Sequence, residues 1–150
     1  MINTKRLDWD NYFLDIAEMV AVRSTCPRLS VGAVIVFNNR IIGTGYNGAE
    51  SDDDHCKDVG CRTRDGHCTR AVHAEENAIS AAIDNSPWET FSGDILKYRT
   101  ILYVTHTPCR HCIRGAWCYN IRDIRYRAPY GDVIEPETLA DLKMKVEQVK

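Results

Sequence analysis

Two apolar runs lie close together early in the chain, Val31-Gly32-Ala33-Val34-Ile35-Val36-Phe37 and Ile41-Ile42-Gly43-Thr44-Gly45-Tyr46. The short segment between them begins with Asn38-Asn39, residues that favour turns. Apolar runs of this length on either side of a turn are typical of two paired strands. The stretch therefore predicts a β-hairpin, from which the rest of the fold can be worked out.

Helices and strands alternate on both sides of this hairpin. Upstream, apolar residues recur at helical spacing from Trp9, with Asp8 as the N-cap, and the helix should end near Ser24 because Cys26 precedes a proline. Downstream, the pattern predicts a helix over residues 70–83, an irregular connection over 87–97, a strand over 101–104, a helix over 109–119, a strand over 121–126 and a helix over 136–146. This αββαβαβα order predicts an α/β fold in which helices cover both faces of a mixed sheet.

Length and charge limit the classes of protein to consider. The chain has 150 residues, a size suited to one domain over residues 1–150, and a net charge of −2. No apolar run is long enough to span a membrane, and no export signal is visible, so we expect a cytoplasmic protein (of the cell, or of the host if phage-encoded) without a membrane partner. The slightly acidic balance also argues against a nucleic-acid partner.

Cysteine is the unusual feature of the composition. The seven cysteines occupy positions 26, 56, 61, 68, 109, 112 and 118, with three inside the window 56–68 and a C-x-x-C pair at 109 and 112. Clusters of this kind in a chain without a signal peptide are more often metal ligands or catalytic groups than a disulfide framework.

Two short motifs together predict a catalytic zinc site. His73-Ala74-Glu75 lies in the predicted helix 70–83, and Pro108-Cys109-Arg110-His111-Cys112 begins the next helix. The pattern H-x-E…P-C-x-x-C is the signature of zinc nucleobase deaminases. His73, Cys109 and Cys112 offer three ligands and leave a fourth position for water, while Glu75 is placed to move protons. Alone, the C-x-x-C could be a redox pair or half of a structural zinc site, and the H-x-E could be solvated surface.

Further motifs extend this signature into a resemblance over about residues 9–130. They are Cys26-Pro27-Arg28, the run at 31–36, Gly45-Tyr46-Asn47-Gly48, the continuation of the histidine motif to Ile79, and Tyr103-Val104-Thr105. With them the chain resembles the deoxycytidylate (dCMP) deaminases of the zinc-dependent cytidine deaminase-like superfamily. The resemblance implies a three-layer α/β/α fold and hydrolysis of dCMP to dUMP and ammonia, which supplies dUMP for thymidylate synthesis. It also implies a homohexamer that dCTP activates with Mg²⁺ and dTTP inhibits.

The resemblance also implies a second, structural zinc, since phage and microbial members of the family commonly carry one. The polar segment at about residues 48–68 has no periodicity, and a four-ligand site would tie this insertion to the end of the first helix. We favour Cys26, Cys56, Cys61 and Cys68 as its ligands. His67 is the first substitute and His55 a weaker one, and the alternative is a flexible loop with free thiols.

A mononucleotide substrate needs further contacts, which the resemblance assigns residue by residue. Arg28 is expected to hold the phosphate, with Ser24 nearby, and Asn47 to hold the sugar. Ala74 and Pro108 are expected to shape the base pocket, and Tyr126 and Tyr130 to close over the nucleotide, although Arg28 and both tyrosines could be ordinary surface residues. The effector is assigned to Gly45, Asn47 and Gly48, with Asp52 or Asp53 near Mg²⁺.

The remaining cysteine and histidines carry weaker expectations. Cys118 is expected to be a small buried apolar residue, His111 to face solvent, and His106 either to line the site or to be structural. Three other functions compete with dCMP deamination: a polynucleotide editor such as a tRNA adenosine deaminase, a free-nucleoside deaminase, and a binding module with two structural zincs. The last leaves Glu75 and the open fourth ligand position unexplained.

Overall fold

A five-stranded mixed sheet lies at the centre of the computed structural model, which describes residues 5–86, 99–131 and 134–150, apart from the side chain of His67. The predicted connection at 87–97 lies outside these residues. In spatial order the strands are β2 (Arg40–Tyr46), β1 (Gly32–Phe37), β7 (Thr100–His106), β8 (Asp123–Ala128) and β9 (Lys145–Gln148). β1 is antiparallel to both neighbours, whereas β7, β8 and β9 run parallel to one another. The mixed sheet is as predicted.

The β1–β2 hairpin is confirmed. Its turn places Asn38 and Asn39 at φ 49° and 59°, a left-handed conformation that two-residue hairpin turns need and that Asn tolerates. A register shift between Ile35 and Val36 marks an irregularity in the pairing.

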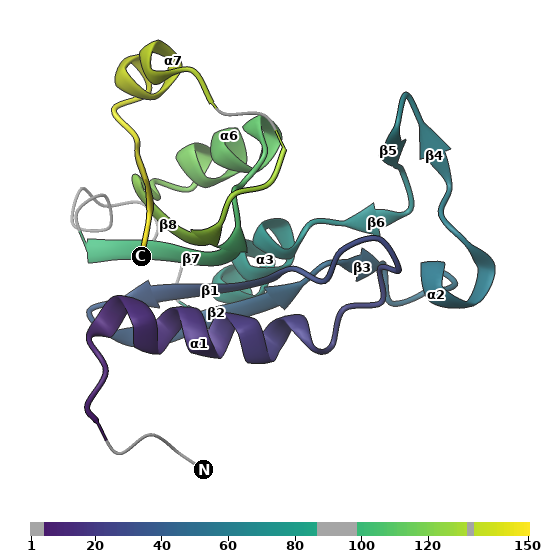
Figure 1. Cartoon of the computed structure of the whole chain (residues 1–150), viewed down its shortest axis with the longest axis horizontal. Helices are drawn as coiled ribbons and strands as arrows, with labels where there is room; N and C mark the ends of the chain where they lie inside the picture. Colours follow the sequence, from purple (N-terminus) through teal and green to yellow (C-terminus); the bar gives the residue numbers. More distant parts are fainter. Residues whose placement is uncertain (1–4, 87–98, 132–133) are drawn as a thin grey trace.

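Helices cover both faces of the sheet, which confirms the three layers (Figure 1). α1 (Trp9–Ala21) packs Phe13 and Leu14 onto one face. α3 (Ala74–Asn85) and α6 (Arg110–Cys118) pack onto the other face, where small residues such as Ala78 and Ala116 allow close approach. No helix in the described ranges is both long and apolar enough to cross a bilayer.

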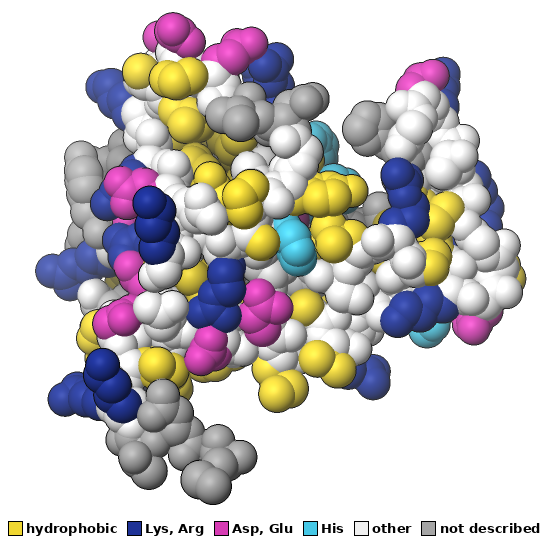
Figure 2. Space-filling view, viewed as in Figure 1, with side chains coloured by type: hydrophobic (Ala, Val, Ile, Leu, Met, Phe, Trp, Pro, Cys, Tyr) yellow, Lys and Arg dark blue, Asp and Glu magenta, His cyan; other side chains and the backbone are white. Residues whose placement is uncertain are grey.

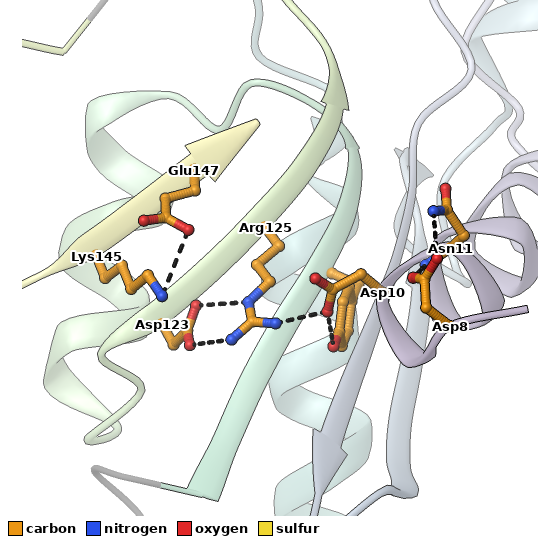
Figure 3. Close-up of polar contacts among 8 residues, drawn as sticks. Asp8, Asp10, Asn11, Asp123, Arg125, Lys145 and Glu147 are labelled. Atoms are coloured by element: carbon orange, nitrogen blue, oxygen red, sulfur yellow. Dashed lines mark hydrogen bonds and ion pairs between the residues drawn. The ribbon is translucent and has the colours of Figure 1, made fainter. Parts of the chain in front are cut away.

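A polar network fastens α1 to the sheet (Figure 3). The carboxylate of Asp10 on α1 accepts hydrogen bonds from Arg125 (2.5 Å) on β8 and from the hydroxyl of Tyr103 (2.8 Å) on β7. Arg125 also donates to both oxygens of Asp123, at 3.1 and 2.8 Å. At the start of the helix, Asp8 is the N-cap, as predicted, and accepts from the backbone N–H of Asn11.

The polar insertion is more ordered than the sequence suggested. Its two ends pair as the short strands β3 (Gly48–Ala49) and β6 (Ala71–Val72), which form an antiparallel ladder. Between them lie α2 (Cys56–Val59) and a hairpin of β4 (Thr63–Arg64) and β5 (His67–Cys68), which projects from the body of the protein (Figure 1).

The predicted helix over 70–83 begins later, at Ala74. Residues 71 and 72 are held in β6 by pairing with β3, so the helix can start only after them. His73 is therefore the N-cap, in an extended conformation, rather than a residue inside the helix.

The predicted terminal helix over 136–146 is wrong in its second half. α7 (Pro136–Asp141) ends because Lys143 adopts φ 52°, and Met144 N–H closes the end by bonding to the Leu139 carbonyl. The chain then forms β9, which pairs with β8. The other boundaries differ from prediction by no more than three residues, β8 starting at Asp123 rather than at residue 121 and α1 ending at Ala21.

Candidate active site

The start of α3 and the start of α6 bring three metal-ligand side chains together. His73 is the N-cap of α3 and Cys109 the N-cap of α6, while Cys112 lies in the first turn of α6. The Nδ1 atom of His73 lies 3.7 Å from the Sγ atom of Cys109 and 3.3 Å from that of Cys112. One imidazole and two thiols within 4.8 Å of one another are the donor set of a three-coordinate protein site for zinc.

Hydrogen bonds among the same three side chains shift the pKa values of His73 and Cys109. The hydrogen bond with Cys109 raises the pKa of His73 to about 9. Hydrogen bonds, first from the Cys112 thiol and then from His73, lower the pKa of Cys109 to about 3 against the opposing effect of burial. The cluster therefore favours a thiolate at Cys109, the form that binds metals.

Glu75 lies beside this cluster and is almost fully buried, with 4% of its surface exposed. It follows His73 by two residues, in the first turn of α3. Burial raises the pKa of its carboxyl above the ordinary value, and the charge of His73 opposes that shift. A carboxyl in this position can hold a proton next to a metal site without being a ligand.

A cavity of about 190 Å³ opens over these groups. Figure 2 shows the β4–β5 hairpin standing away from the body of the protein, with a notch between them. The cavity is lined by His73, Ala74, Glu75 and Cys109 at its floor, and around them by Cys26, Arg28, Leu29, Val31, Asn47, Gly66, Cys68, Ala71, Val72, His106, Thr107 and Tyr130.

The cavity includes four of the seven predicted substrate residues, namely Arg28, Asn47, Ala74 and Tyr130. The guanidinium of Arg28 donates to the carbonyl of Gly66 in the hairpin, at 3.2 Å. The other three, Ser24, Pro108 and Tyr126, do not line it. Tyr126 instead packs partly buried against the main core, on the face covered by α3 and α6.

Ser24 and Asn47 are occupied by contacts within the protein. The Oδ1 atom of Asn47 accepts from the Ser24 hydroxyl (2.6 Å) and the Val31 N–H (2.8 Å), and its Nδ2 donates to the Leu29 carbonyl (2.8 Å). Asn47 therefore fixes the segment that carries Arg28 and keeps one N–H for a ligand.

Several lining residues were not singled out by the sequence analysis. Thr107 accepts the N–H of Tyr130 at 3.1 Å and so fixes the position of that residue over the cavity. His106, which was expected either to line the site or to be structural, does line the cavity, and its ring centroid is 6.1 Å from that of Tyr130. Leu29, Val31 and Val72 add apolar wall. Val31 and Val72 fell inside a predicted strand and a predicted helix, where an apolar residue is ordinarily read as part of the core, so nothing in the sequence marked them as cavity wall.

A second cysteine cluster lies in the insertion. The sulfur atoms of Cys56, Cys61 and Cys68 are within 4.8 Å of one another, and those of Cys56 and Cys68 are 3.8 Å apart. Burial raises the pKa of Cys56 to about 11, while backbone N–H groups lower that of Cys68 to about 7 despite its burial.

Cys26, the predicted fourth ligand, is buried but not part of this group of three. The segment before it is tied to α2, since the backbone N–H of Lys57 donates to the Thr25 carbonyl and its ammonium to the Ser24 carbonyl (2.8 Å). The side chain of His67 lies outside the described residues, and His55 is exposed beside Asp58.

Of the residues assigned to an effector, Asn47 lines the cavity already described, and the two glycines pack against other parts of the chain. Gly45 and Gly48 are buried, and a side chain at either would collide with α3 or with Thr25. Asp53 is in an ion pair with Arg70 at 2.5 Å, whereas Asp52 is exposed.

Two predictions about α6 have different outcomes. Cys118 is exposed, so its expected burial is wrong: the buried side of α6 carries Cys112, Ile113 and Ala116, and the last residue of the helix lies off that side. His111 is exposed, as expected, but it is not free, because its Nε2 lies 2.6 Å from a carboxylate oxygen of Glu76.

The chain is similar to known proteins in both sequence and structure. The sequence model of a family described as "Cytidine and deoxycytidylate deaminase zinc-binding region" matches residues 7–128. ComE operon protein 2 of Bacillus subtilis is 40% identical over 126 residues, which cover 84% of this chain and 62% of that protein. The deoxycytidylate deaminase of Mycobacterium phage D29 is 40% identical over 118 residues, 71% of this chain and 84% of the phage enzyme.

Solved structures give the same relationship. The dCMP deaminase of cyanophage S-TIM5, crystallised with dCMP and dUMP, superposes with a TM-score of 0.75 at 27% identity and covers 97% of this chain and 99% of its own. The chain spans 62% of the Bacillus protein and only 40% and 39% of the deoxycytidylate deaminases of Schizosaccharomyces pombe and Saccharomyces cerevisiae.

Proposed function

Because the chain belongs to the cytidine and deoxycytidylate deaminase family, we propose that it hydrolyses dCMP to dUMP and ammonia and so supplies dUMP for thymidylate synthesis. The observation that carries this proposal is the convergence of His73, Cys109 and Cys112 beside the buried Glu75, at a cavity that His73, Cys109 and Glu75 line. The S-TIM5 enzyme, which matches along nearly the whole chain, was crystallised with this substrate and this product.

The donor set at the floor of the cavity fits zinc, and His73, Cys109 and Cys112 would hold it. When bound, the metal would act as a Lewis acid and lower the pKa of a bound water molecule from about 15.7 to about 7. Glu75 takes the proton of the water that attacks C4 of the cytosine ring and delivers it to N3. The hydroxyl now on C4 gives its proton to Glu75, which passes it to the departing amine as the C4–N bond breaks to form dUMP and ammonia. The burial of Glu75 keeps bulk water away from both transfers.

Replacing Glu75 tests this assignment. Glu75→Gln should retain zinc and lose deamination by about 100-fold or more, the usual contribution of a positioned acid–base group. Glu137→Gln, an exposed carboxylate on α7, is the matched control and should keep full activity. A Glu75→Gln enzyme with wild-type turnover would overturn the mechanism.

Arg28 is the proposed phosphate ligand. It lines the cavity, and although the residue is exposed, its guanidinium is held against the β4–β5 hairpin by the contact with the Gly66 carbonyl. Arg28→Ala should raise the KM for dCMP and leave activity on deoxycytidine, which has no phosphate, unchanged. The control is Arg64→Ala, which removes an exposed arginine of the β4–β5 hairpin. An Arg28→Ala enzyme that still prefers dCMP would refute the assignment.

Other substrate contacts follow from the same cavity. Ala74 is proposed to border the base, and Tyr130 to cover the nucleotide, since both line the cavity. Ser24 and Asn47 are proposed to support Arg28, because their hydrogen bonds fix the segment of the chain that carries Arg28. Pro108 is proposed to act through its neighbours Thr107 and Cys109.

A structural zinc is proposed for the insertion, held by Cys56, Cys61 and Cys68 with Cys26 as the fourth ligand. The proximity of the three sulfur atoms and the attachment of α2 beside Cys26 support it. The wild-type protein should contain two zinc ions per chain, Cys61→Ser one, and the exposed-cysteine control Cys118→Ser two. If elemental analysis finds only one zinc ion per wild-type chain, the proposed second site is refuted.

Regulation and assembly are proposed from the resemblance to deoxycytidylate deaminases alone. We expect dCTP with Mg²⁺ to activate the enzyme, dTTP to inhibit it, and the chain to form a homohexamer in the cytoplasm. Sedimentation and rate measurements with each nucleotide test these proposals. Gly45, Asn47 and Gly48 remain the proposed effector contacts, and Asp52 is a better candidate for Mg²⁺ than Asp53, because Arg70 already pairs with the latter.

One set of assays distinguishes dCMP deamination from a second candidate function, deamination of a polynucleotide. A tRNA:A34 deaminase has the same fold at a TM-score of 0.57 and 22% identity, a likeness that concerns the fold alone. Release of ammonia should be fastest from dCMP among dCMP, dCTP, deoxycytidine and a short single-stranded DNA. Preference for the polynucleotide would favour the editor instead.

A further inference from the structure

The carboxylate of Glu76 joins the two turns that carry the candidate zinc ligands. Its Oε2 atom accepts the backbone N–H of His73 at 3.2 Å, at the start of α3. Its Oε1 atom accepts from Nε2 of His111 at 2.6 Å, and His111 lies between Cys109 and Cys112 at the start of α6. One side chain therefore contacts the backbone of one ligand and the residue between the other two.

This link is distinct from the contacts among the ligands themselves. The His73 imidazole also joins the two turns, through its hydrogen bonds with the two sulfur atoms. A bound metal would replace those contacts, whereas the Glu76–His111 contact stays available. The rings of His73 and His111 are 6.5 Å apart, so the link lies directly beside the cluster.

The exposure of the pair argues against a role in overall stability. The side chain of His111 is 75% exposed and that of Glu76 36%, and exposed pairs of this kind contribute little to the free energy of unfolding. Glu75 and Glu76 are adjacent in sequence but face different surroundings, one buried in the cavity and the other on the outer side of the cluster.

We propose that Glu76 and His111 form a clasp that holds His73, Cys109 and Cys112 in the arrangement that binds zinc. Glu76 and His111 are positioning residues, since they act through the ligands and touch neither substrate nor metal. The clasp rests on the proposed zinc site. Removing a residue that hydrogen-bonds to a metal ligand, without being a ligand itself, usually weakens metal binding by about 10- to 100-fold.

A double-mutant cycle tests the clasp. Zinc transfer to a chelator is timed for the wild type, Glu76→Ala, His111→Ala and the double variant, and the visible spectrum of the Co²⁺-loaded forms reports the ligand geometry. Glu76→Ala should release one zinc equivalent about 10-fold faster and shift the cobalt bands. Removing His111 should accelerate release in the wild type and have no further effect when Glu76 is already absent.

Controls separate the clasp from folding and from the proposed function. Glu147→Ala removes an exposed carboxylate paired with Lys145 on β9 and should change neither the release rate nor the spectrum. Metal-free His111→Ala should unfold at the urea concentration of the wild type, whereas both variants that lack Glu76 also lose the capping bond to the His73 N–H and should unfold at a slightly lower concentration. If His111→Ala releases zinc like the wild type, or if its effect is equal in both backgrounds, the clasp is refuted. Failure of the wild type to bind zinc or cobalt with thiolate ligands would instead refute the proposed site, and the clasp with it.

Discussion

Replacing Gly45 by alanine should displace α3, the helix that carries Glu75. Gly45 lies on β2, and its Cα faces the backbone of α3. An added Cβ atom would lie 2.8 Å from the carbonyl carbon of Asn77 and closer still to Ala78 N and Ala74 O. Ordinary contact begins at 3.4 Å, so the shortfall is about 0.6 Å at Asn77 and larger at the other two atoms. Because all three are backbone atoms, no side-chain rotation relieves the collision.

Two effects of this displacement are measurable. Overpacking of this kind costs about 1–3 kcal/mol, and the rigid neighbours favour the upper end, so the urea midpoint of unfolding should fall clearly. An α3 shift approaching 1 Å should also lower kcat/KM for dCMP by up to about 100-fold.

The matched control is Gly115→Ala on α6. A Cβ atom there meets nothing within 4 Å, and alanine in a helix is more favourable than glycine by about 0.5–1 kcal/mol, so this variant should be more stable than the wild type. A Gly45→Ala protein with wild-type stability and activity would show that β2 and α3 are not packed as described.

Three further changes probe the sheet and its polar contacts. Tyr103→Phe removes the hydroxyl that donates to Asp10 inside the protein and should lower the free energy of unfolding by about 1.5 kcal/mol in urea titrations, without changing kcat. Arg127→Ala breaks an exposed pair with Asp15 and should cost less than about 1 kcal/mol by the same measurement; a loss as large as that of Tyr103→Phe would contradict this ranking. Burial lowers the pKa of His106 below its ordinary 6.5, so the unfolded chain binds its proton first and stability falls as the pH drops below about 6.5. The urea midpoint of His106→Gln should therefore fall less between pH 7 and pH 5.5 than that of the wild type, and identical slopes would refute this assignment.

Local sequence signals predicted the parts of the fold in which neighbouring residues decide the conformation. The β1–β2 hairpin, the N-cap at Asp8 and the convergence of His73 with Cys109 and Cys112 all depend on short motifs. The expectation for the end of the chain was wrong because residues 145–148 form β9 only by pairing with β8, which a helical pattern in the sequence does not reveal.

The start of α3 could not be predicted for a related reason. Residues 71 and 72 belong to a ladder with a segment more than twenty positions earlier, so no local signal places the helix start at Ala74. The clasp was missed because His111 and Glu76 come from different helices and meet only in the folded chain. The exposure of Cys118 likewise depends on which side of α6 meets the sheet.

The β3–β6 ladder also separates one part of the cavity wall from the candidate zinc ligands and Glu75. Because Ala49 pairs with Ala71, residues 50–70 leave and rejoin the body of the protein at one point. That excursion contributes Gly66 and Cys68 to the cavity wall, whereas His73 and Glu75 lie after the ladder on α3. Changes of length or composition in the excursion can therefore reshape the mouth of the cavity while the reacting groups stay in place. A protein engineer has here a segment that can be varied to change what fits against this wall of the cavity.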